Sequence, residues 1–247
     1  MKRGPVLAFH KEKRTPIKYF FWRFTLKEII WMIIAILIFG FTIGISYNTE
    51  KGTLSFNFTL SILLTSLIII PVSILAKKIT ANWYSMKVEH SLWKWQRWGY
   101  YERSYFNKPV PMGILFPILV SVLTLGYVKP FVFLEFDSEN IFEKRILKKQ
   151  GSRRATRKSE INESDPAFTA AGGFYSLIIL AIVGAILFHY FKITFGATLA
   201  KYAIFYGAWN LVPWGKLDGA KLFFGSLLSW AFIVIIYLIS LVLVLIL

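Results

Sequence analysis

Long apolar runs alternate with short polar segments along this chain. An α-helix needs about 20 mostly apolar residues to cross the hydrocarbon core of a bilayer. Runs of roughly this length cover residues 26–47, 58–81, 170–190, 195–212 and 226–247. The pattern therefore predicts an all-α polytopic membrane protein whose single membrane domain, residues 26–247, contains about five transmembrane helices.

Aromatic and basic residues dominate residues 82–110, which follow the second apolar run. Apolar and polar positions alternate imperfectly there, and they alternate again over 131–136, which predicts short β-strands. Tryptophan and tyrosine are typical of the membrane interface, so we expect these strands to lie there. An alternative role for the same surface is to hold an extended peptide by strand addition.

The apolar segment 111–128 is interrupted by Pro117 and Gly126, and basic residues flank it on both sides. The positive-inside rule places both flanks in the cytoplasm, which a single crossing does not allow. We therefore expect a re-entrant or hairpin element that is packed in protein. Two short interfacial helices are the alternative.

Charge is concentrated in a basic N-terminal arm, residues 1–25, and in a basic loop, residues 137–165. The net charge is +16, but the basic residues flank apolar segments, so they indicate contact with anionic lipid rather than with nucleic acid. This predicts a multi-pass cell membrane protein with a cytoplasmic N-terminus. Cysteine is absent, which excludes disulfides and thiolate metal sites.

One segment, 210–219, places a carboxylate, a proline and two glycines between two apolar runs. Ionisable groups at such places are costly and usually have a task. Asn210, Pro213, Asp218 and Gly219 form the spacing Asn-x-x-Pro-x-x-x-x-Asp-Gly, which resembles the third-ligand motif of the site-2 proteases, a family of intramembrane zinc metalloproteases.

A second segment, Ala171-Gly172-Gly173-Phe174-Tyr175-Ser176, is similar to the Ala-Gly-Pro-x-x-Asn segment of that family, with Gly173 in place of proline and Ser176 in place of asparagine. The resemblance is closest to the archaeal-type members and covers about residues 58–225. It implies a site-2-protease-like core with a metal-motif helix, an aromatic strand region, a re-entrant segment and two core helices.

The resemblance also implies a His-Glu-x-x-His motif on the second apolar run, where two histidines hold zinc and the glutamate activates water. This chain has Ser73, Ile74 and Lys77 at the matching positions. Serine is a poor zinc ligand, isoleucine cannot accept a proton, and a protonated lysine repels the metal. Asp218 alone does not hold zinc tightly, because catalytic sites use about three protein ligands. We therefore expect no cofactor.

Lys77 and Asp218 are predicted to lie near the same side of the membrane, so a buried ion pair could replace the metal as the link between two helices. The alternative is that Lys77 snorkels to the lipid interface while Asp218 only caps a helix.

These features favour a degenerate, proteolytically inactive pseudoprotease that binds or regulates transmembrane segments of partner proteins through the former substrate groove. Two alternatives stay open. One is an active zinc endopeptidase with relocated ligands, such as His90, His189 and Asp218, although no ligand spacing in the sequence supports it. The other is a small channel or transporter, which interrupted helices and intramembrane charges would suit.

Overall fold

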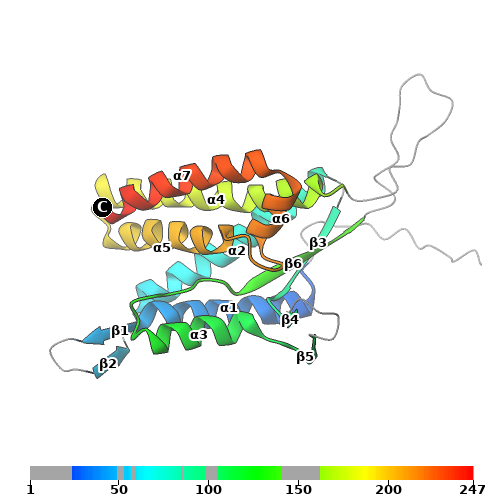
Figure 1. Ribbon diagram of the computed structural model, residues 1–247. Coiled ribbons are helices and arrows are strands. Elements are labelled where there is room, and N and C mark those ends of the chain that lie inside the picture. The colour runs from blue at the N-terminus through cyan, green and yellow to red at the C-terminus, as the bar shows by residue number, and fades with distance from the viewer. Residues whose placement is uncertain are drawn as a thin grey trace, which may run out of the picture.

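The computed structural model describes residues 24–48, 53–56, 59–84, 86–97, 105–140 and 162–246 (Figure 1). Within these ranges the chain is mostly helical, with small two-stranded sheets. The helices are α1 (Leu26–Gly44), α2 (Leu60–Trp83), α3 (Met112–Leu123), α4 (Ser164–His189), α5 (Thr194–Leu211), α6 (Asp218–Gly225) and α7 (Leu227–Ile246). The strands are β1 (Ile45–Asn48), β2 (Thr53–Phe56), β3 (Met86–Leu92), β4 (Trp95–Arg97), β5 (Tyr105–Val110) and β6 (Leu134–Asn140).

Four of the described helices, α1, α2, α4 and α7, are long and apolar enough to cross a membrane. The predicted segment 195–212 is also helical, as α5, but Lys201 and Asn210 reduce its hydropathy, so the estimate of about five spans is corrected to four candidates. The predicted span at 26–47 is also too long, because the chain leaves α1 at Ile45 and enters β1.

α4 begins at Ser164, whereas the sequence predicted a span from residue 170 and a loop over 137–165. Polar residues suggested a loop, but Asp165 and Pro166 are both well tolerated in a first helical turn. At the other end of the predicted loop, residues 137–140 belong to β6. The basic residues 143–158 and the N-terminal arm before residue 24 lie outside the described residues.

The predicted strands over 82–110 are present as β3, β4 and β5, although α2 extends to Trp83. β3 pairs antiparallel with β6, with Met86 opposite Asn140 and Leu92 opposite Leu134. β4 pairs with β5, and β1 pairs with β2 in a segment where the sequence predicted no strand. Alternate residues of β3 are buried, which is the pattern of a strand with one face against the core.

Residues 111–133 form a hairpin: α3 runs along the bundle and the extended segment 127–133, here called the return strand, comes back (Figure 1). Both ends meet at Trp93, whose carbonyl accepts from Gly113 N at 2.9 Å and whose N–H donates to Phe133 O at 2.9 Å. The tip lies at the far end of α1, because a side chain on Gly126 would contact Ile45 O. α3 has only 12 residues, about 18 Å, too short for a full crossing. This geometry matches the hairpin that the flanking charges predicted.

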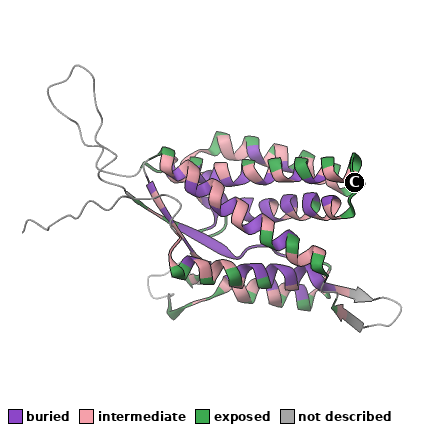
Figure 2. Ribbon diagram, turned by 180° about the vertical axis from the view of Figure 1, so that it is seen from behind, coloured by how far each residue is buried: buried purple, intermediate pink, exposed green. Residues whose placement is uncertain are grey.

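The bundle has two distinct ends (Figure 1). The β1–β2 end holds β1, β2 and the end of α4, and the β3–β6 end holds β3, β6, α6 and the start of α4. Buried residues line the interior between them (Figure 2), among them Phe39, Ile69 and Ile204. Many large apolar side chains are nevertheless exposed. Leu228, for example, is 86% exposed. Such an apolar exterior fits contact with a lipid bilayer.

Candidate functional site

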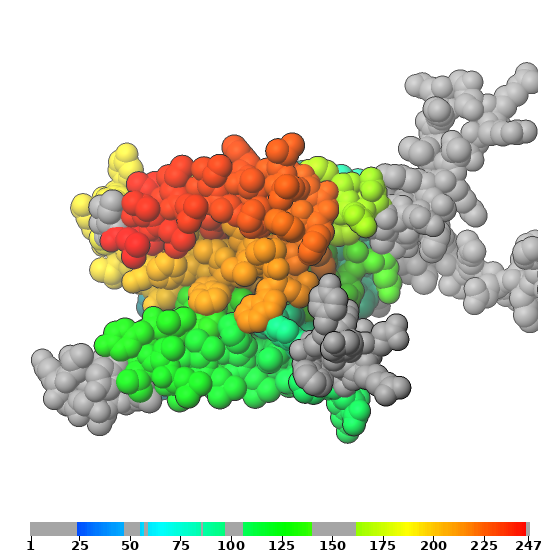
Figure 3. Space-filling view, viewed as in Figure 1, coloured from blue at the N-terminus to red at the C-terminus, as the bar shows by residue number. Residues whose placement is uncertain are grey.

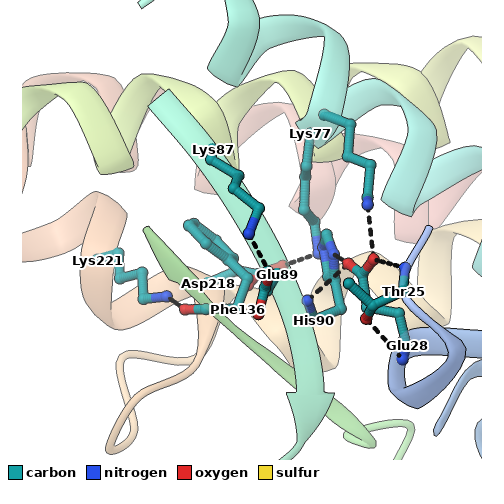
Figure 4. Close-up of polar contacts among 10 residues, drawn as sticks. Thr25, Glu28, Lys77, Lys87, Glu89, His90, Phe136, Asp218 and Lys221 are labelled. Atoms are coloured by element: carbon teal, nitrogen blue, oxygen red, sulfur yellow. Dashed lines mark hydrogen bonds and ion pairs between the residues drawn. The ribbon is translucent and has the colours of Figure 1, made fainter. Parts of the chain in front are cut away.

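Two neighbouring lysines on α2 are both buried, and each forms an ion pair with a different helix. Lys77 Nζ pairs with Asp218 Oδ2 at the start of α6, and Lys78 Nζ lies 2.7 Å from Glu28 Oε2 on α1. Figure 4 shows Glu28, Lys77, His90 and Asp218 gathered at the β3–β6 end. Lys77 is only 4% exposed, so it does not snorkel to the surface as the alternative required.

Ser73 and Ile74 lie on α2 about one helical turn before Lys77, and both are buried. Ser73 and Lys77 have i, i+4 spacing, which places them on one face of the helix. The three positions that the resemblance matches to the zinc motif are therefore inside the protein, and Lys77 is the one that contacts Asp218.

Two features fix the segment around Asp218: the hydrogen bonds of Asn210 and the close packing at Gly219. Asn210 Nδ2 donates to Phe131 O at 2.9 Å and to Tyr206 O at 2.8 Å, which ties α5 to the return strand. A side chain on Gly219 would collide with the carbonyl of Leu211, so only glycine lets α6 begin this close to α5. Pro213, by contrast, lies in the exposed loop between α5 and α6.

Asp218 itself is 2% exposed and is the first residue of α6, where the helix dipole favours a negative charge. Oδ2 contacts Lys77, and Oδ1 has no hydrogen-bond partner among the described residues. An ion pair between helices is thus the principal contact of this carboxylate, beyond any role at the helix start.

The small residues at the 171–176 segment lie on α4 where it faces α2. A side chain on Gly173 would come within 2.7 Å of Lys77 Cε, and one on Gly172 would collide with the Thr80 side chain. Ala171 is buried beside them, and Ser176 Oγ donates to Gly173 O at 2.7 Å. Gly173 therefore leaves the space through which the stem of Lys77 reaches Asp218.

Glu28 is a member of the cluster that the sequence reasoning missed. It is 4% exposed, and besides Lys78 its carboxylate accepts from His90 N at 2.9 Å and from Thr25 N at 3.1 Å. The available signal was its position, since Glu28 is a carboxylate near the start of an apolar span, and such groups are usually functional or paired.

His90 is also buried beside Glu28. Its Nδ1 lies 3.4 Å from Glu28 Oε1, and its Nε2 has no hydrogen-bond partner among the described residues. Burial lowers the pKa of His90 to about 4, although the bond to Glu28 opposes this effect. His90 is therefore neutral at physiological pH.

Lys221 on α6 completes the cluster on the side of β6 (Figure 4). Its Nζ donates to Phe136 O and lies 3.3 Å from the centre of the Phe136 ring. Burial lowers the pKa of Lys221 to about 8, partly offset by the negative charge of Asp218.

The donor set of this cluster does not fit zinc. Within the described ranges, three or more histidine or acidic side chains are nowhere grouped closely enough to hold a metal ion. His189 lies in the last turn of α4, at the β1–β2 end, so the relocated site formed by His90, His189 and Asp218 is wrong. The ammonium group of Lys77 is also paired with the Asp218 carboxylate, and its positive charge opposes the binding of a metal cation there.

An open pocket of about 610 Å³ adjoins the cluster at the β3–β6 end. It lies between β6, the start of α4 and α6, and charges of both signs line it. Its charged lining residues are Asp137, Glu163, Lys216 and Lys221. Phe224, which also lines it, is 75% exposed, so the pocket offers apolar as well as ionic contacts.

Comparison of the chain with family models, with curated proteins and with solved structures gives no match.

Proposed function

We propose that this chain is a multi-pass membrane protein of the site-2 protease type that has lost its metal and binds other membrane proteins instead of cutting them. One observation carries the proposal: Lys77, at a position where the resemblance implies a zinc-binding histidine, forms a buried ion pair with Asp218, where it implies the third ligand. In this proposal the ion pair replaces the metal as the link between α2 and α6.

The pocket beside the cluster supports the binding role. Its volume of about 610 Å³ lies within the range of roughly 300–1,000 Å³ that is typical of ligand sites. Its acidic and basic lining residues and the exposed ring of Phe224 suit a polypeptide that leaves the membrane at this end. The partner in this proposal is a transmembrane segment with its adjoining polar residues.

The orientation in the proposal follows from charge. The first described residues of α1 and α4, which follow the basic segments, both lie at the β3–β6 end. The positive-inside rule then places this end, together with the N-terminus, in the cytoplasm.

The first experiment is metal analysis of the purified protein by mass spectrometry, combined with a cleavage assay on a model transmembrane substrate. We expect less than one tenth of a zinc ion per chain, roughly the level of adventitious binding when the two histidine ligands are missing. Stoichiometric zinc that disappears in Asp218→Asn but persists in Asp137→Asn, or cleavage that a chelator blocks, would overturn the proposal.

The second experiment restores the ligands that the resemblance implies. In the variant Ser73→His, Ile74→Glu, Lys77→His, two imidazoles on one face of α2 are expected to meet Asp218 and to bind about one zinc ion per chain. The matched control adds Asp218→Asn to the same variant and should bind none. A restored variant that is folded and binds no zinc, or whose zinc does not depend on Asp218, contradicts the correspondence of these positions.

A further inference from the structure

The β1–β2 end carries a second concentration of charge, which the proposed function does not use. Lys129 on the return strand donates from Nζ to Ile43 O at 2.8 Å, near the end of α1. Lys201 on α5 is exposed, and its Nζ lies 5.9 Å from the centre of the Phe205 ring. Burial, and then the positive charge of Lys201, lower the pKa of Lys129. The two ammonium groups are thus close enough to repel each other.

Neither lysine has an acidic partner among the described residues. The lysines that form ion pairs there are Lys77, Lys78 and Lys87. The described carboxylates lie in the first turn of α1, on β3 and β6, around the start of α4 and on α6, all at the β3–β6 end. Glu28, for instance, is about 22 Å along α1 from Ile43. The positive charge at the β1–β2 end is therefore not compensated by the part of the chain that the structure describes.

A pocket of about 360 Å³ lies between the return strand and α5, and both lysines line it. Aromatic rings form most of its remaining wall, namely those of Tyr127, Phe131, Tyr202, Phe205 and Trp209. Lys201 and Tyr202 also line a second pocket, of about 490 Å³, which reaches toward the ends of α1 and α7. In Figure 3, α5 and the segment that contains α3 and the return strand meet along a seam on the molecular surface.

We propose that Lys129 and Lys201 bind a phosphate group in the pocket between the return strand and α5. A phosphate offers several acceptor oxygens, which match two ammonium donors and the hydroxyl of Tyr202. The four candidate spans begin or end at the β1–β2 end, and tyrosine and tryptophan are typical of the level at which lipid head groups lie. The phosphate has two sources, an anionic phospholipid head group or free phosphate. The inference is independent of the proposed function.

The test titrates the delipidated full chain with phosphatidylglycerol, with phosphatidylcholine and with inorganic phosphate, and it measures bound ligand by native mass spectrometry. We expect phosphatidylglycerol to bind more tightly than phosphatidylcholine. Each of Lys129→Met and Lys201→Met should weaken this binding about fivefold, and the double variant roughly 30-fold, since each lysine contributes like a basic residue at a charged membrane surface.

Lys192→Met is the matched control, because Lys192 lies in the turn between α4 and α5 at the same end but does not line the pocket. It should bind like the wild type, and Lys201→Arg should retain binding because it keeps the charge. Loss of inorganic phosphate binding in the double variant, without any lipid preference, supports the site with free phosphate as the source. Equal binding of all ligands by the wild type and a folded double variant overturns the proposal.

Discussion

The two ends of the bundle treat their lysines in opposite ways. At the β3–β6 end, Lys77 and Lys78 each meet a carboxylate that is at most 4% exposed, Asp218 and Glu28. At the β1–β2 end, Lys129 and Lys201 interact with each other, and within the described residues their contacts are a carbonyl oxygen and an aromatic ring.

This difference distinguishes charges that are paired within the chain, here called structural charges, from charges that are available to a ligand, here called binding charges. A buried charge whose partner is supplied by the same chain is neutralised when the protein folds, so it contributes to the arrangement of the helices. A charge without such a partner remains unfavourable until a ligand of opposite sign arrives, so it contributes to binding. Removing charge should therefore have opposite consequences at the two ends, and the following predictions use that contrast.

The largest effect is expected where one partner of the Lys77–Asp218 pair is removed. Asp218→Ala leaves an uncompensated ammonium in the interior, and Lys77→Ala leaves an uncompensated carboxylate. Each should lower the free energy of unfolding by about 3–5 kcal/mol. The measurement is reversible unfolding of the purified protein in mixed micelles.

The double variant Lys77→Met, Asp218→Leu removes both charges and should recover most of this loss, because a well-packed apolar pair can replace a buried ion pair. Additive losses from the two positions would show that the pair is not coupled. Asp137→Asn, an exposed carboxylate on β6, is the control and should change the stability by less than about 0.5 kcal/mol.

A smaller effect is expected from lowering the pH. His90 has a pKa of about 4 in the folded protein and an ordinary value of 6.5, so between these values the unfolded chain binds more protons than the folded one. Stability is therefore fully present above pH 6.5 and is lost as the pH falls toward 4. From pH 7 to pH 5 the loss from His90 should be about 2 kcal/mol.

Other groups also titrate in this range, so the informative quantity is the difference between the wild type and His90→Gln. Glu28, Lys77 and Asp218 surround His90 and remain in both proteins. The variant should have a shallower dependence of unfolding free energy on pH. Parallel curves for the two proteins would refute the assignment of the loss to His90.

A substitution at Gly173 should have a still smaller effect on stability, and this effect should depend on the presence of Lys77. Gly173→Ala places a methyl group 2.7 Å from Lys77 Cε and should cost about 1 kcal/mol by displacing the lysine stem. In the Lys77→Ala background the same substitution should cost nearly nothing, as measured by unfolding. Gly172→Ala is the control, since its methyl group meets Thr80 and its cost should not depend on residue 77. An equal cost of Gly173→Ala in both backgrounds argues against a role in placing Lys77.

The sequence predicted the elements whose signals are periodic or long. Four of the five predicted apolar runs are candidate spans, alternation predicted the strands near β3, and the basic flanks of 111–128 predicted a re-entrant or hairpin element. It placed the start of α4 too late, because a helix that extends beyond the membrane can begin with polar residues such as Asp165. Pairing of β3 with β6 is a contact between segments more than 40 residues apart, for which the local pattern carries no signal.

The cluster was only partly accessible to sequence reasoning for a similar reason. Lys77 and Asp218 were singled out because motif spacing drew attention to both, whereas Glu28 and His90 belong to no motif. Their side chains meet because α1 passes beside β3, which is a property of the packed bundle. The phosphate pocket was missed altogether, since Lys129 and Lys201 are 72 positions apart and are brought together by the return strand.

The smallest expected effect is the change in stability caused by Lys201→Gln. The sign of this change should differ between two lipids, and that difference tests the contrast between the two ends. In phosphatidylcholine nanodiscs, Lys201→Gln removes repulsion from Lys129 and should stabilise the protein by a few tenths of a kcal/mol, roughly what screened, exposed charges contribute. In phosphatidylglycerol nanodiscs the same substitution removes a ligand contact and should destabilise the protein, because a ligand that binds the folded state raises its stability. Lys192→Gln should change the stability by the same amount in both lipids. If Lys201→Gln also has the same effect in both, the lysines at the β1–β2 end are not binding charges, and the distinction between the two ends is lost.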